Sequence, residues 1–512
     1  MSISLLGQTI VTTLRLEPRY ADLEVVGYSA ARHAMGIYGC VAVTCRYIVP
    51  PGFEDESLRD VFEAAVAQVV SKLGPLRVGI AGQDTTKPVY VQQPSVDIRQ
   101  HVEWKALDPS SSTYDSDLLR LSEHQLCQHF TDVDRRPPWK LIAIPNSAAG
   151  SLDAMFALHH AVGDGTSAAL FHTHLVEALN HPEEAGAVVQ GTVVAIPEKP
   201  VLVPAQEDLV RFRMSWSFLL QQLWKAMAPS WLRSFLSPVS ASWTANPVTF
   251  SPMAMHMRLV TIHPSNVPVL LSACRSNGVT LTALLNALLC ALLARRLPKE
   301  LPRSFSATVP VSLRPFAPSP LESGLDLATA VCNLVTVLYF QFPPDVVADL
   351  CGNPAAFASS LENSDDTNIW HLSARLREQI KERIRRIPND DPVDMLSWVS
   401  DWPTWFRQQQ GGSRSCSWEV SNLGSIAGED GRPEGRGWTI RRPMFAQPGN
   451  VNGAAFTVNV LGIRGDAISI TLAWQETVME TELAEAIAAD LQRCLDDFAR
   501  TGTFGVLSAS RI

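Results

Sequence analysis

The stretch His159-His160-Ala161-Val162-Gly163-Asp164-Gly165 decides how this chain is interpreted. It follows an apolar run typical of a strand and precedes a segment whose apolar residues recur at helical spacing, so we expect a strand-to-helix connection. Successive residues of a strand point to opposite faces, which places His159 and His160 on opposite sides. One imidazole can therefore face a cleft while the other is buried.

The residues after the two histidines fit a tight turn that leads into a helix. Asp164 is a residue type that caps helix N-termini by accepting backbone N–H bonds. Gly163 and Gly165 suit a turn and a close approach of backbone to another element. A lone histidine in such a place is usually a hydrogen-bonded structural residue. The doubled histidine, the Asp-Gly pair and the strand-to-helix context together favour function.

Outward from this segment, both halves of the chain mix strands and helices. We expect strands at 40–47, 139–144, 152–158, 253–262, 305–311, 415–421, 455–463 and 467–474. We expect helices at 58–73, from 165 onward, and at 265–278, 281–296 and 482–499. Residues 139–158 are predicted to form one hairpin, and residues 464–466 the turn of another.

The composition indicates a compact protein with two core-bearing units. The chain has 512 residues, 46% hydrophobic and 18% charged. A single core rarely grows beyond roughly 250–300 residues. The net charge of −9 gives no general attraction to phosphate backbones, so we expect no nucleic-acid partner. The nine cysteines show no zinc or redox spacing and fit a reducing compartment.

The domain organisation follows from changes in pattern along the chain. We predict an N-terminal subdomain at 1–182, a linker with a helical segment at 183–250, and a C-terminal subdomain at 251–512. Within the middle part, Trp216, Trp224, Trp231 and Trp243 stand among Phe and Leu. We favour a helical segment packed on the body over an interfacial membrane anchor, because prolines interrupt the stretch and few basic residues flank it.

Three other kinds of site are disfavoured. His172 and His174 lie two residues apart on a helix and so diverge, and neither Cys nor Glu completes a metal set with the histidine pair. The chain has no Gly-x-Ser-x-Gly elbow of a serine hydrolase. Rossmann and Walker glycine patterns are also missing. We expect no metal.

The central motif resembles the HHxxxDG motif of the chloramphenicol acetyltransferase-like superfamily. Stretches at 136–141, 278–284 and 309–315 agree with that superfamily in order and spacing. Tyr28-Ser29-Ala30-Ala31-Arg32-His33 and Ser421-Asn422-Leu423-Gly424 are similar to its fungal alcohol acetyltransferase-like branch. The DFGWG motif of plant BAHD enzymes is absent. The resemblance spans nearly the whole chain but is diffuse between the motifs.

The resemblance implies a fold and a division of roles. The fold is α/β, with two chloramphenicol acetyltransferase-like subdomains, a crossover linker and an active-site tunnel between them. His160 is implied to be the general base, acting on an acceptor that attacks a thioester without a covalent acyl-enzyme. Asp164 is implied to point away from the substrate and to pair with Arg314, so both support the site structurally. His159 is expected to be buried beside them.

The oxyanion of the tetrahedral intermediate needs a preorganised hydrogen-bond donor. Candidates are the Gly165 backbone amide and the side chains of Ser421 and Asn422. The alternative for residues 421–424 is a plain turn, because Asn and Gly are turn formers. We weigh these two interpretations equally.

The implied reaction is acyl transfer, with acetyl favoured, from acyl-CoA to the hydroxyl of a hydrophobic molecule, in secondary metabolism. The alternatives are a condensation-type catalyst that uses a carrier-protein thioester or an amine acceptor, and a non-catalytic binding protein. We expect a monomer with no permanently bound cofactor. The N-terminus lacks signal-peptide features, and Ser510-Arg511-Ile512 resembles a peroxisomal address only distantly, so the expectation is a cytoplasmic protein.

Overall fold

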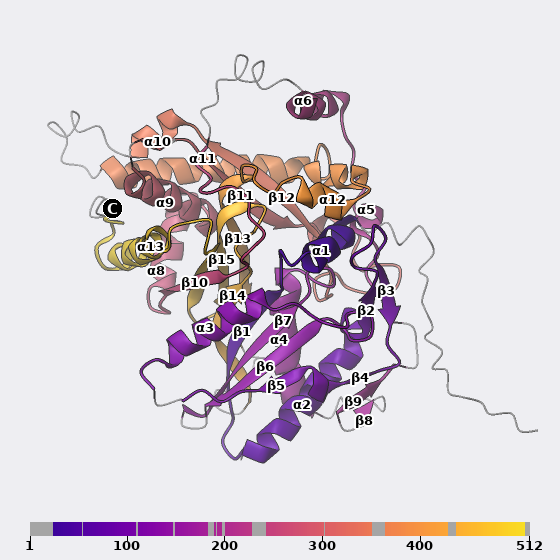
Figure 1. The fold of residues 1–512 in the computed structure, drawn as a ribbon. Helices are drawn as coiled ribbons and strands as arrows, with labels where there is room; N and C mark the ends of the chain where they lie inside the picture. The colour runs from indigo at the N-terminus through magenta and orange to yellow at the C-terminus, as the bar shows by residue number, and fades with distance from the viewer. Residues whose placement is uncertain are drawn as a thin grey trace, which may run out of the picture.

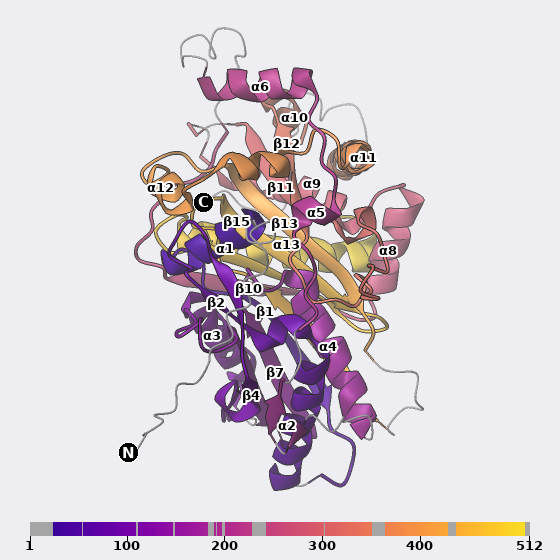
Figure 2. The same cartoon turned by 90° about the vertical axis from the view of Figure 1, so that its right-hand side faces the viewer.

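Two mixed α/β halves stack on one another in the computed structural model (Figures 1 and 2). The structure describes residues 24–53, 55–108, 111–146, 149–182, 189–190, 192–196, 200–227, 242–298, 300–301, 303–350, 364–428 and 437–506. One half is built on a five-stranded sheet in the order β14-β1-β7-β6-β5. The other is built on a six-stranded sheet in the order β10-β16-β15-β13-β11-β12.

The first sheet is covered by helices on both faces. Its strands are β1 (Val41–Ile48), β5 (Val102–Trp104), β6 (Trp139–Asn146), β7 (Ser151–Leu158) and β14 (Thr439–Ala446). Alternate residues of β1, such as Val41 and Val43, pack in one core with α2 (Asp55–Lys72) and α4 (Gly165–Asn180). Ala42 packs on the other face with α3 (Tyr114–Cys127). All eight residues of β7 are buried, as expected for a central strand covered on both faces.

The second sheet packs against a helical layer centred on α9 (Leu281–Arg296). Its strands are β10 (Met255–Ile262), β11 (Phe305–Ser312), β12 (Val335–Phe342), β13 (Cys416–Ile426), β15 (Ala454–Ile463) and β16 (Ile468–Gln475). The other helices of this half are α8 (Val267–Ser276), α10 (Pro344–Leu350), α11 (Ser364–Arg386) and α13 (Thr481–Thr501). Residues Ala283 to Ala294 of α9 are all buried, because the helix is apolar around its whole circumference.

β14 ties the two halves together. It follows β13 in the chain, yet it pairs antiparallel with β1 in the first sheet. Thr471 of the second sheet donates its hydroxyl to the Phe445 carbonyl of β14 at 2.6 Å. A core that combines Met155, Met257, Met444 and Ala473 lies where the halves meet. One strand from the C-terminal stretch therefore completes the sheet of the N-terminal half, which no local pattern indicates.

The elements around the predicted motif match the sequence-based expectations. β6 and β7 form the predicted hairpin in register from Trp139 opposite Leu158, and β15 and β16 form the second hairpin. α4 begins at Gly165. The expected strand at 415–421 is too short, because β13 continues to Ile426 through a register shift between Asn422 and Ser425. Strong periodicity was therefore reliable, whereas strand ends were not.

Several elements lie in stretches that the sequence left unassigned. They include α3, β5, β12, α10, α11 and β14, and also α1 (Glu24–Ala34), α12 (Trp402–Arg407), the β2–β3 pair (Val78–Ala81 and Val89–Gln92) and β4 (Ser95–Asp97). Part of the predicted linker forms β8 (Val189–Gln190) and β9 (Val193–Ala195), which join β4 in a small sheet, and α5 (Gln206–Leu209) follows. Our boundaries at 182/183 and 250/251 stay a prediction.

The tryptophan-rich segment does not pack on the body as expected. α6 (Trp216–Met227) stands at the periphery in both views (Figures 1 and 2). Trp216 is 79% exposed, Leu220 63% and Trp224 48%. The packing prediction was wrong for this helix, because apolar composition alone does not specify what covers a side chain. Trp243 is buried in the second core, and Trp231 lies outside the described residues.

Among the described helices, none is by itself long and apolar enough to cross a bilayer. α8 and α9 together have the required length and composition, but they are bent by 93° relative to one another.

Candidate active site

The motif turns sharply between β7 and α4, and Asp164 fixes that turn. The Asp164 carboxylate accepts a hydrogen bond from the Ser167 backbone N–H at 2.8 Å and another from the Ser167 hydroxyl at 2.9 Å. The residue is therefore the N-cap of α4. The Ser167 hydroxyl oxygen accepts the Cys332 N–H at 3.0 Å and lies 2.7 Å from the Cys332 carbonyl, so the cap is joined to the chain just before β12.

The ion pair expected between Asp164 and Arg314 is present. Arg314, which follows β11, donates from Nη1 to Oδ2 at 2.6 Å and from Nη2 to Oδ1 at 3.0 Å. Both side chains are buried. Burial alone would raise the pKa of Asp164, but the Arg314 charge and the hydrogen bonds outweigh it, so the pKa is lowered. Both carboxylate oxygens are occupied in this network, which leaves the carboxylate committed to holding the turn.

Gly165 is required by a close approach. A Cβ at this position would lie 2.8 Å from Cζ of Phe445 on β14 and 3.0 Å from Cδ2 of Leu423 on β13. Any side chain here would push the start of α4 away from the other half of the molecule. The glycine therefore keeps the motif against the strands that form the opposite wall of the site.

His159 lies inside the protein. Its Nδ1 accepts the Ala161 N–H at 2.9 Å, and its ring packs on His33 with the centroids 4.3 Å apart. Burial, followed by the neighbouring histidines His33, His160 and His129, lowers its pKa well below the usual value. His159 is thus a neutral packing residue in this structure.

His160 points the other way, into a large cavity. The cavity has a volume of about 500 Å³ and is lined by both halves. The ring meets Tyr38 edge-on, with the centroids 5.5 Å apart. Burial lowers the pKa of His160, and the Arg32 charge lowers it further, while a hydrogen bond to its own backbone carbonyl and the Asp164 charge act in the opposite direction. The imidazole is therefore neutral near pH 7 and able to accept a proton.

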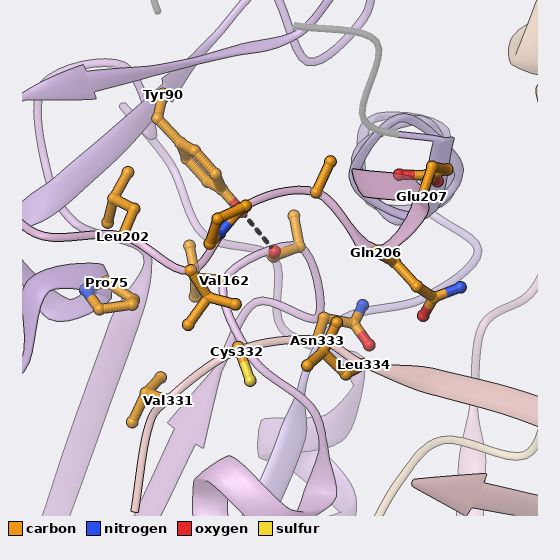
Figure 3. A pocket seen from close by; sticks show the side chains of 14 residues that line it. Pro75, Tyr90, Val162, Leu202, Gln206, Glu207, Val331, Cys332, Asn333 and Leu334 are labelled. Atoms are coloured by element: carbon orange, nitrogen blue, oxygen red, sulfur yellow. Dashed lines mark hydrogen bonds between the residues drawn. The ribbon is translucent and has the colours of Figure 1, made fainter. Parts of the chain in front are cut away.

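Asn333 holds His160, although no motif or periodicity singles out this asparagine. Its Nδ2 donates to the His160 carbonyl at 2.7 Å and lies 3.1 Å from His160 Nδ1. Figure 3 shows Asn333 beneath the motif turn, where the Tyr90 hydroxyl also donates to the Ala161 carbonyl at 2.7 Å. Nδ1 is thus turned toward Asn333 and its own carbonyl, which leaves Nε2 for a substrate.

The three oxyanion candidates line the same cavity as His160. Ser421 and Asn422 lie on β13, and Gly165 opens α4. The Asn422 amide is largely engaged, because Nδ2 donates to the Thr282 hydroxyl at 3.0 Å and Oδ1 accepts the Gly424 N–H at 2.8 Å. Gly424 has φ +75°, so the local structure is a turn inserted in a strand. Asn422 is accordingly the least free of the three.

His172 and His174 have hydrogen-bond partners within the protein. The His172 ring lies 2.8 Å from the Tyr47 hydroxyl through Nδ1 and 2.9 Å from the Val43 carbonyl through Nε2. His174 contacts the Thr329 carbonyl at 3.0 Å on the other side of α4. Both rings therefore serve packing and hydrogen bonding away from the cavity.

A polar cluster on the cavity wall was also not among the site residues predicted from the sequence. Glu419 on β13 accepts from Gln447 Nε2 at 2.9 Å and from the Thr308 hydroxyl at 3.2 Å. The Tyr38 hydroxyl donates to Gln447 Oε1 at 3.3 Å. The signal was the single charged residue of the β13 sequence, two positions before Ser421 and so on the same face.

Comparisons with known proteins agree with this geometry. A profile of the alcohol acetyltransferase family matches residues 106–324. The chain is 30% identical over 491 residues to "Probable alcohol acetyltransferase FCK4" of Fusarium pseudograminearum, covering 94% of this chain and 95% of that protein. It is 23% identical over 476 residues to "Probable alcohol acetyltransferase crmB" of Aspergillus fumigatus, covering 88% and 94%.

Solved structures show the same fold at low identity. The trichothecene 15-O-acetyltransferase TRI3 of Fusarium sporotrichioides superposes with a TM-score of 0.66 at 11% identity, covering 94% of each chain. The first condensation domain of the CDA synthetase superposes with a TM-score of 0.56 at 14% identity, covering 96% and 97%. The two halves are therefore chloramphenicol acetyltransferase-like subdomains. The 30% identity to FCK4 extends over nearly the full length of both proteins, and it establishes that the chain belongs to the alcohol acetyltransferase family.

Proposed function

We propose that this acyltransferase moves an acyl group, with acetyl favoured, from acyl-CoA to the hydroxyl of a hydrophobic small molecule. The observation that carries the proposal is the neutral imidazole of His160 on the wall of a cavity of about 500 Å³. Such a volume suits a small-molecule site. The names of the relatives support an alcohol acceptor and an acetyl donor.

In the proposed mechanism, His160 Nε2 takes the proton of the acceptor hydroxyl as its oxygen attacks the thioester carbonyl carbon. The tetrahedral intermediate then collapses, the carbon–sulfur bond breaks, and the imidazolium returns the proton to the thiolate of CoA. The products are an ester and free CoA. A covalent acyl-enzyme is not needed, because the acceptor attacks the donor directly.

The oxyanion of the intermediate is assigned to the Gly165 amide and the Ser421 hydroxyl. Both line the cavity with His160, whereas the Asn422 amide already bonds to Thr282 and Gly424. Donors fixed in advance are the most effective form of this stabilisation. Asp164 and Arg314 take no part in proton transfer, since both are held in the network behind the turn.

The proposal is tested by turnover with free acetyl-CoA and a panel of hydrophobic alcohols, without any carrier protein. We expect ester formation, with kcat/KM rising with pH below a pKa that is lower than about 6.5 and flat above it. The sign follows because only neutral His160 accepts a proton and burial favours that form. Product mass and free thiol release give the readout. An absolute requirement for a carrier-bound acyl group, or an inflection above pH 7, would contradict the proposal.

Asn333 is proposed as a positioning residue for His160. Replacing Asn333 by Ala removes the bond to the His160 carbonyl, so the ring samples unproductive orientations. We expect kcat to fall roughly tenfold with KM changed less than twofold, because misplacement of a catalytic group affects the chemical step. Steady-state kinetics with both substrates provide the measurement. Loss of binding with kcat retained would show that Asn333 shapes the pocket instead.

A further inference from the structure

Glu419 is a buried carboxyl in the cavity that the acyl transfer does not use. It lines the cavity together with His160 and lies on the same face of β13 as Ser421. Its neighbours Trp418 and Val420 face the apolar core of the second half. A carboxyl removed from water is costly unless it is fully hydrogen-bonded. The position of Glu419 therefore calls for an explanation in terms of what the cavity binds.

The hydrogen bonds within the protein leave Glu419 with unused capacity. Oε1 accepts from Gln447 and Oε2 from Thr308, one bond each. A carboxylate offers about four lone-pair sites, so each oxygen can take another donor. Burial raises the pKa of Glu419, although the two hydrogen bonds and the Arg32 charge partly offset that effect.

Arg32 supplies a complementary donor on the same wall. Its Nη2 donates to Asn450 Oδ1 at 2.7 Å, and its guanidinium lies over the Tyr38 ring, 4.2 Å from the centroid. Its Nε is buried and has no hydrogen-bond partner among the residues that the structure describes. Within that part of the chain, no ion pair joins Arg32 to Glu419. The wall thus presents an acceptor and a donor that do not satisfy each other.

The chemistry of this pair selects a neutral group that both donates and accepts. A hydroxyl donates to Glu419 and accepts from the guanidinium of Arg32, which lines the same cavity. A ketone or an ether oxygen only accepts, and a phosphate or carboxylate is repelled by Glu419. The amide N–H groups of the CoA arm donate, but these groups leave Arg32 without an acceptor unless a carbonyl follows in the right place.

We propose that Glu419 and Arg32 form a polar subsite for a second hydroxyl of the acceptor, one that is not acylated. The preferred acceptor is then a diol or polyol on a hydrophobic skeleton. The inference rests on the proposed function, in which the acceptor is the alcohol that is acylated, and it adds the class of that alcohol. No bond is made or broken at the subsite.

The test measures binding, independently of turnover. Calorimetry compares octanol with its vicinal, internal and terminal octanediols on the wild-type protein, on Glu419→Gln, and on Glu322→Gln, which removes an exposed carboxyl as a matched control. We expect at least one diol to bind the wild type about tenfold more tightly than octanol, as a hydrogen bond to a charged group allows. The preference should disappear in Glu419→Gln and persist in Glu322→Gln.

The other outcomes are decisive as well. Equal weakening of octanol and diols in Glu419→Gln, or no diol preference in the wild type, overturns the subsite. A weaker affinity for CoA with the diol preference intact assigns the carboxyl to the donor and also overturns it. If thermal melting shows that Glu419→Gln does not fold, Glu419→Asp keeps the charge, shortens the reach and should reduce the preference. If the diol preference depends on Glu419 but the protein transfers no acetyl group, the proposed function is refuted and the subsite stands.

Discussion

Replacement of His160 by alanine is expected to lower kcat/KM for acetyl transfer by about 10²–10⁴-fold, the usual contribution of a positioned general base. The residual rate comes from the oxyanion donors and from holding donor and acceptor together, which the substitution leaves in place. The pH dependence below neutrality should vanish with the imidazole, since His160 is the group whose lowered pKa governs it. Initial rates between pH 5 and 8 measure both effects.

The matched control for this substitution is His263→Ala, which removes an exposed histidine outside the cavity. It should retain the wild-type rate and pH profile. Thermal melting establishes that both variants are folded. Wild-type turnover in folded His160→Ala would refute the mechanism, and Nε2 would then have no role in the proton transfer.

The strand-to-helix unit around the motif could be predicted because its signals are local. An apolar run of strand length assigned β7, helical spacing assigned α4, and Asp164 has the side chain that caps a helix. The pairing of Asp164 with Arg314 spans 150 positions in sequence. Periodicity contains no information about such a contact, so the prediction depended on the family resemblance.

Two other features show what the sequence could not provide. No strand was predicted at β14, and only the tertiary structure places it beside β1 rather than with its sequence neighbours. α6 is as apolar as a core helix, yet Trp216 and Leu220 are exposed, because burial depends on a partner surface.

The polar members of the site form a third class. The side chains of Asn333 and Glu419 line the cavity. Their directions are set only when the two halves of the molecule pack together. Glu419 was the more detectable of the two, since acidic residues are depleted in strands and it is the single charge in β13. Asn333 stands in an irregular stretch before β12, where side-chain direction has no simple period.

Replacement of Arg314 by methionine is expected to destabilise the fold by about 3–5 kcal/mol, because it leaves the buried Asp164 carboxylate without its counter-charge. Urea unfolding followed by tryptophan fluorescence gives the measurement. The double substitution Asp164→Asn with Arg314→Met removes both charges and should recover part of the loss. The surface control is Glu382→Gln, whose partners Arg385 and Arg386 are exposed, and it should change stability by less than about 1 kcal/mol.

The same pair predicts a dependence of stability on acid. The pKa of Asp164 is lower in the folded protein than in the unfolded chain, where it is about 3.9. The contribution of the pair is therefore present in full above that unfolded value and is lost as the pH falls through the lowered folded pKa. Arg314→Met should flatten this acid limb of the stability curve. An unchanged acid limb, or a loss no larger than that of Glu382→Gln, would mean that the motif turn is held by the α4 cap and the packing at Gly165 without help from the ion pair.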